Sequence, residues 1–63
     1  MGPDLECMIE DIFANDRKVE LSRSRNGVYK CVMLNEGGTT SLSFYSDESI
    51  WDAVRQAWQV LFG

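Results

Sequence analysis

The side chains that carry most enzyme chemistry are sparse in this sequence. It contains no histidine, and its two cysteines, Cys7 and Cys31, have no CxxC spacing. A serine or cysteine nucleophile would need an unusual base, and a structural zinc would lack a set of ligands. There is no glycine-rich phosphate loop, because Gly37-Gly38 is explained by a turn. We therefore predict a protein that is not an enzyme and that uses neither a metal nor a cofactor.

Aromatic and sulfur-containing side chains are stronger candidates for a function, because tyrosine, tryptophan and methionine are enriched where proteins bind proteins. The residues that we predict to contact a partner are Tyr29, Cys31, Met33, Tyr45, Trp51 and Trp58. Each has a structural alternative. Cross-strand tyrosines also stabilise a solvated sheet face, and the two tryptophans could close a seam between two helices.

Two groups of charged residues could bind electrostatically. Arg23, Arg25 and Lys30 gather near a predicted hairpin tip, where they could contact an anion or form a solvated tip with Lys30 over Phe44. A row of acids could mimic phosphates toward a nucleic-acid-binding protein, or could form the solvated side of a helix. This row consists of Asp4, Glu6, Glu10 and Asp11.

Composition limits the class of protein. Six Lys+Arg against ten Asp+Glu give a formal net charge of −4, which disfavours general binding to nucleic acid or anionic membranes. The 63 residues suit one domain, 1–63, with a core so small that a partner or a homodimer would add useful stability. The N-terminus lacks the build of a signal peptide, and no apolar run is long enough to span a membrane, so we expect a cytoplasmic location.

Helical spacing of apolar residues marks both ends of the chain. Residues 4–14 predict a helix that Asn15 can end. Ser46-Asp47 predicts the cap of a second helix, with Asp47 and Glu48 in its first turn and its end at Phe62.

Three strands are predicted between these helices. Asn26-Gly27 favours a two-residue type I′ turn, which would place Leu21 opposite Val32. A second loop of three or five residues would place Leu34 opposite Thr40. This register leaves Tyr29, Cys31, Met33 and Tyr45 on an open face. The face predicted to meet the helices carries Val19, Leu21, Val32, Leu34, Leu42 and Phe44.

The order helix, three antiparallel strands, helix predicts an α+β fold of two layers. In this two-layer α-β-β-β-α arrangement, both helices pack on one face of a three-stranded antiparallel meander.

The same order resembles that of double-stranded-RNA-binding domains over nearly the whole chain. Lysines at the start of the last helix grip phosphates in that family, whereas Asp47, Glu48 and Asp52 stand at the matching positions here. The acidic segment 46–53, which contains Ala53, is similar to the junction of a strand and a helix in the antitoxin half of HicA/HicB toxin pairs.

The leading prediction is a small protein–protein interaction module, alone or as a homodimer, that occupies a partner's surface. The first alternative is an acidic phage-type or antitoxin-type inhibitor of a nuclease or DNA-binding protein. The second is a nucleic-acid-binding domain that uses the basic hairpin tip.

Overall fold

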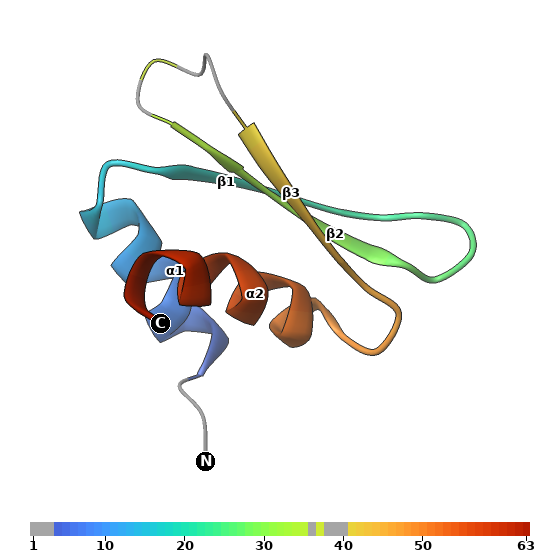
Figure 1. The fold of residues 1–63 in the computed structure, drawn as a ribbon. Helices are drawn as coiled ribbons and strands as arrows, with labels where there is room; N and C mark the ends of the chain where they lie inside the picture. The colour runs from blue at the N-terminus through green and yellow to red at the C-terminus, as the bar shows by residue number, and fades with distance from the viewer. Residues whose placement is uncertain (1–3, 36, 38–40) are drawn as a thin grey trace.

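The computed structural model describes residues 4–35, 37 and 41–63 (Figure 1). The elements are α1 (Leu5–Ala14), β1 (Lys18–Arg23), β2 (Tyr29–Leu34), β3 (Ser41–Ser46) and α2 (Ile50–Phe62). The strands form one antiparallel sheet in the order β1-β2-β3, and both helices lie against the same face of it (Figure 1). The predicted α+β fold is therefore confirmed. No helix in the described ranges is long and apolar enough to cross a membrane.

Helix α1 begins at a side-chain cap. The carboxylate of Asp4 accepts a hydrogen bond from the backbone N–H of Cys7 at 2.8 Å, which satisfies a donor that the first turn leaves free. Met8 and Ile12, four residues apart on the same side of the helix, are fully buried. The helix ends at Asn15, and Asp16 then adopts a positive φ of 60°, a region that aspartate tolerates better than most residues. The predicted helix is confirmed to within one residue.

Helix α2 begins later than predicted. Its cap is Ser49, whose hydroxyl accepts from the backbone N–H of Asp52 at 3.1 Å. The hydroxyl of Ser46 instead accepts from the N–H groups of Glu48 and Ser49, so it closes the turn between β3 and α2. The predicted cap and first turn at residues 46–48 are therefore wrong, whereas the predicted end at Phe62 is confirmed.

The first hairpin has a three-residue loop. The backbone N–H of Ser24 donates to the carbonyl of Val28 at 2.9 Å, and the N–H of Gly27 donates to the carbonyl of Ser24 at 3.1 Å. Gly27 has a φ of +82°, while Asn26 does not share the positive φ that a type I′ turn requires. The predicted two-residue turn is therefore wrong, and every pair moves by one residue, so that Leu21 lies opposite Cys31.

The second hairpin also differs from its prediction by one residue. Leu34 pairs with Ser41, so an even number of residues, 35–40, separates the paired ends. The predicted odd loop is wrong. Thr40, the predicted partner of Leu34, lies outside the described residues, and so does Gly38 of the predicted Gly37-Gly38 turn. Gly37 is described, with a φ of +88°.

These two shifts turn β2 over while β1 and β3 keep their predicted faces, because a slip of one residue exchanges the two sides of a strand. The helix-covered face carries Val19, Leu21, Arg23, Tyr29, Cys31, Met33, Leu42, Phe44 and Ser46. The other face, called the open sheet face below, carries Lys18, Glu20, Ser22, Lys30, Val32, Leu34, Ser43 and Tyr45. Val32 and Leu34 are thus outside the core in which they were predicted.

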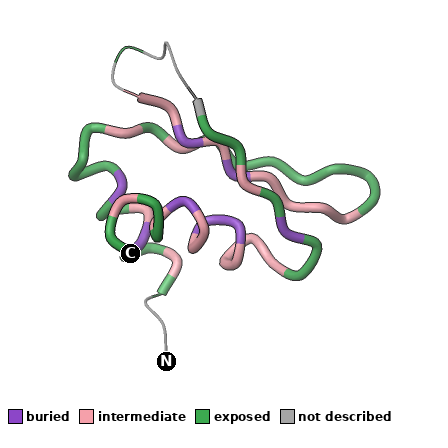
Figure 2. The backbone as a smooth tube through the Cα atoms, viewed as in Figure 1, coloured by how far each residue is buried: buried purple, intermediate pink, exposed green. Residues whose placement is uncertain are grey.

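The core lies where the two helices meet the central strand (Figure 2). Alanines on α2 have short side chains that allow the helix to approach the sheet closely, and the adaptable thioethers of Met8 and Met33 fill the space between the layers. The buried apolar residues are Met8, Ile12, Cys31, Met33, Ala53, Val54 and Ala57.

Candidate protein-interaction surface

The residues predicted to share one binding face lie on two sides of the sheet. Cys31 is 0% exposed and Met33 is 3% exposed, so both belong to the core. Tyr29 is partly buried on the helix-covered face, and only Tyr45 of the four lies on the open sheet face. Their predicted placement on one open face is therefore wrong for Tyr29, Cys31 and Met33. The physical reason is the one-residue shift of both hairpins, which points the odd-numbered residues of β2 toward the helices.

The open sheet face has an apolar centre that the sequence analysis missed. Val32 and Leu34 are partly buried by their neighbours, although no helix lies over this face, and Tyr45 is 55% exposed. The alternation of apolar residues that marked Val32 and Leu34 was present in the sequence, but it was assigned to the core. The face therefore presents aliphatic and aromatic surface together, as the centres of protein interfaces do.

Basic groups dominate the rim of the open sheet face. Among the residues of this face that the structure describes, Lys18 and Lys30 accompany a single acid, Glu20, in a chain whose formal net charge is −4. Lys30 lies opposite Tyr45, and its Nζ is 5.8 Å from the centroid of the Tyr45 ring. The predicted contact of Lys30 with Phe44 is wrong, because these two residues are on opposite faces. A cation thus lies beside an exposed aromatic ring on the open sheet face.

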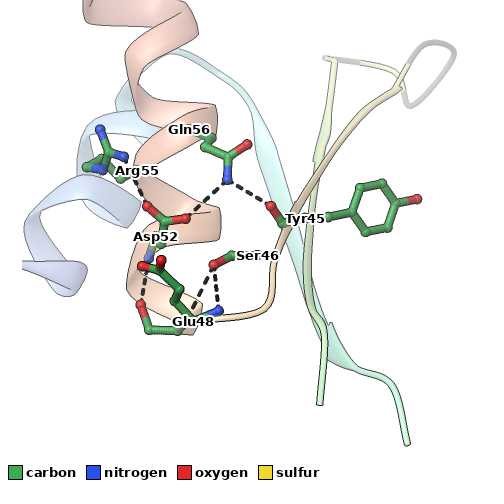
Figure 3. Close-up of polar contacts among 7 residues, drawn as sticks. Tyr45, Ser46, Glu48, Asp52, Arg55 and Gln56 are labelled. Carbon is green, nitrogen blue, oxygen red and sulfur yellow. Dashed lines mark hydrogen bonds and ion pairs between the residues drawn. The ribbon is translucent and has the colours of Figure 1, made fainter. Parts of the chain in front are cut away.

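The backbone of Tyr45 is held by α2 (Figure 3). Nε2 of Gln56 donates to the Tyr45 carbonyl oxygen at 2.8 Å and to Oδ2 of Asp52 at 3.4 Å. The other carboxylate oxygen of Asp52 pairs with Arg55 at 3.0 Å, and this hydrogen bond is the main reason that the pKa of Asp52 is lowered. Figure 3 shows the Tyr45 ring pointing away from α2. The helix thus holds the backbone of the strand and leaves the Tyr45 ring exposed.

The tryptophans predicted to bind a partner pack against the core. Nε1 of Trp58 donates to Oδ2 of Asp11 in α1 at 3.0 Å, and its ring lies 5.5 Å from that of Phe62. Trp51 is partly buried, with the Arg55 guanidinium 5.5 Å from its ring centroid. The placement of Trp58 supports the alternative in which it closes the seam between the helices.

The basic hairpin tip is arranged differently from its prediction. Arg23 pairs with Tyr29 and lies 5.5 Å from that ring, while Lys30 pairs with Ser22. Arg23 and Lys30 are therefore on opposite faces of the sheet, whereas the predicted register, with Leu21 opposite Val32, would have placed them opposite each other. Arg25 is exposed in the loop.

The predicted row of phosphate-mimicking acids is interrupted. Asp4 caps α1, and the hydrogen bond from the Cys7 backbone is the main reason that its pKa is lowered. Asp11 accepts from Trp58. All four acids are exposed, and Glu6 and Glu10 are the two whose side chains make no hydrogen bond within the described part of the chain.

The two thiols lie in different environments. Cys31 is buried, which raises its pKa to about 11, whereas Cys7 is exposed on α1 with its pKa raised mainly by its hydrogen bond with Asp4. Within the described ranges there is no pocket and no group of three or more side chains suited to a metal ion.

Comparison with known proteins assigns no relative to the chain. No family model matches it, and neither the curated proteins nor the solved structures include a significant match.

Proposed function

We propose that this chain is a non-enzymatic protein-interaction module that binds a partner through the open sheet face. The partner surface would combine apolar groups with acidic side chains. The observation that carries the proposal is the set of Val32, Leu34 and Tyr45 on the one sheet face that no helix covers, where Val32 and Leu34 are partly buried and Tyr45 is exposed.

The shape of this face suits docking by a protein rather than a small ligand. The sheet provides a firm backbone, and no pocket is present in the described part of the chain. Tyrosine supplies a large contact area at a low cost in conformational entropy, because it has only two side-chain torsions. The hydrogen bond from Gln56 to the Tyr45 carbonyl limits the motion of the strand that carries it. Binding would therefore require little reorganisation of this module.

Charge supports an acidic partner. Lys18 and Lys30 flank the apolar centre, and Glu20 is the only acid among the described residues of this face. Rim charges mainly affect the rate of association and its salt dependence, so the complex should form more slowly as salt is added. In this proposal the chain contributes the basic groups and the partner the acidic ones. An acidic inhibitor would have the opposite arrangement, because its own acids would contact the partner.

The acidic-inhibitor and nucleic-acid alternatives gain no support from the geometry. Two of the four acids on α1 and its cap have partners within the fold, and two of the three cations at the hairpin tip, Arg23 and Lys30, lie beside tyrosine rings on opposite faces. A cytoplasmic, reducing location remains part of the proposal, because an exposed thiol at Cys7 is most compatible with it.

The proposal can be tested with a double variant, Val32→Ser with Tyr45→Ala, and a matched control, Phe13→Ser. Phe13 is 49% exposed on α1 and is not on the open sheet face. A partner captured from the source organism by the wild-type chain should be purified and titrated against all three proteins. We expect the double variant to weaken binding at least about 100-fold, as removal of central contacts does, and Phe13→Ser to leave it unchanged. Equal binding by the wild type and the double variant would contradict the proposal.

A further inference from the structure

We propose that the free edge of β3 pairs with β3 of a second copy of this chain, which would join two sheets into one of six strands. This inference does not depend on the proposed function, because the contact is made by backbone groups at the edge of the sheet and not by the open sheet face.

The direction of the backbone groups in β3 follows from two hydrogen bonds. Gln56 reaches the Tyr45 carbonyl from α2, which shows that this carbonyl points away from β2. Antiparallel ladders alternate, so the N–H and C=O groups of Ser43 and Ser41 also point outward. The hydrogen bond from Ser24 to Val28 identifies which residues of β1 and β2 bond to each other. Residues of β2 bond alternately to β1 and to β3, and following this alternation to β3 gives the same outward direction for its backbone groups. The outer edge of β3 is therefore a row of backbone donors and acceptors, of which the Tyr45 carbonyl already accepts from Gln56, and an extended strand is the element that can pair the row as a whole.

The two edges of the sheet differ in charge. β1 carries Lys18, Glu20 and Arg23, and charged side chains on an edge strand discourage pairing with other chains. β3 has the sequence SLSFYS, with neither a charge nor a proline. Each copy has a formal net charge of −4, so two copies would repel each other except where their contact surfaces are neutral. Because β3 is the neutral edge, pairing between two copies is favoured at β3 and not at β1.

The residues of β3 are also self-complementary. A two-fold axis beside Ser43 would place Ser43 opposite its own copy and Leu42 opposite the second copy's Phe44, on the helix-covered face. Leu42 is 47% exposed although it lies on that face. Val60 is 56% exposed and follows Gln56 by one helical turn, so it lies on the flank of α2 that faces the β3 edge. Pairing would cover both apolar side chains while it satisfies the backbone groups.

The first test compares Ser43→Pro with Ser43→Ala by light scattering and sedimentation. Proline removes the outward N–H of Ser43 but leaves the ladder to β2 intact, as proline on the solvent side of an edge strand does. Alanine keeps the N–H. We expect the wild type and Ser43→Ala to be dimers and Ser43→Pro to be a monomer with an unchanged circular dichroism spectrum. A wild type that stays monomeric at every accessible concentration overturns the proposal, even if it binds a foreign peptide strand.

The second test does not depend on how well the proline variant folds. In a Cys7→Ser background, Ser43→Cys would place two thiols across the axis, where Cα atoms about 5.5 Å apart permit a disulfide. Ser22→Cys, on the same sheet face but in β1, is the control. We expect mild oxidation to cross-link Ser43→Cys and not Ser22→Cys. Equal cross-linking of both variants, or of neither, contradicts pairing through β3.

Discussion

Trp58 of α2 donates its indole N–H to the carboxylate of Asp11 in α1 at 3.0 Å, so the two helices are joined by a hydrogen bond as well as by apolar contact. The bond lies at the exposed side of the seam, where water can replace it. Trp58→Phe should therefore cost only about 0.5–1.5 kcal/mol of unfolding free energy. Trp58→Ala, which also removes packing against the core, should cost about 2 kcal/mol or more. Urea denaturation measures both, and equal costs for the two variants would show that the ring contributes no packing.

The register of β2 predicts opposite responses from two neighbouring residues. Met33 is 3% exposed between the sheet and the helices, whereas Leu34 lies on the open sheet face. Met33→Ala should lower the unfolding free energy by about 2–4 kcal/mol, within the range for buried large-to-small changes. Leu34→Ala should lower it by less than about 1 kcal/mol, because its side chain already contacts water. The reverse order in urea denaturation would contradict the register.

The first turn predicts a different response at Asn26 and Gly27. Gly27 has a φ of +82° with open space around it, so Gly27→Ala would be strained by its backbone alone, at about 1–2 kcal/mol. Asn26 does not have a positive φ, and Asn26→Ala should change stability by less than about 0.5 kcal/mol. A two-residue type I′ turn would instead penalise both substitutions, which thermal unfolding of the two variants would reveal.

The buried thiol of Cys31 predicts a loss of stability at high pH. Its pKa is about 11 in the folded chain, against 9.0 for an unperturbed thiol. Between these values the unfolded chain binds fewer protons than the folded chain, so unfolding becomes easier as pH rises. The fall should be shallower in Cys31→Ala, which lacks this thiol. In the native protein a maleimide should modify Cys7 and spare Cys31, and rapid modification of both thiols would show that Cys31 is accessible.

The helices and the faces of β1 and β3 could be predicted from the sequence, because their signals are local. Met8 and Ile12 recur at helical spacing, and Leu42 and Phe44 alternate with polar residues on a strand. Tyr45 was correctly expected on the face away from them. β2 is different, because Cys31 and Met33 on one side and Val32 and Leu34 on the other are all apolar. Periodicity cannot choose between its faces, so the choice rested on the turns.

The turns predicted the wrong register for β2 for a specific reason. Asn-Gly suits a two-residue loop, but glycine also suits the last position of a three-residue loop, where only one residue needs a positive φ. Ser24 favours the longer loop, since its hydroxyl also accepts from the N–H of Val28 at 3.2 Å. The aromatic contacts of Lys30 and Arg23 follow from pairing, so they could not be predicted once the pairing was wrong. The hydrogen bond between Trp58 and Asp11 joins residues far apart in the chain, so no local sequence pattern predicts it.

The orientation of β2 underlies both the core and the proposed binding surface, and it can be measured by nuclear Overhauser contacts between Hα protons. In antiparallel sheets these contacts are strongest in the pairs that do not exchange hydrogen bonds, where Cα atoms are about 4.5 Å apart. The structure predicts a strong contact between Leu21 and Cys31 and another between Lys30 and Tyr45. In the register that places Leu21 opposite Val32, those two residues would exchange hydrogen bonds, so the strong contact would instead join Ser22 to Cys31. That result would return Val32 and Leu34 to the core and contradict the proposed surface.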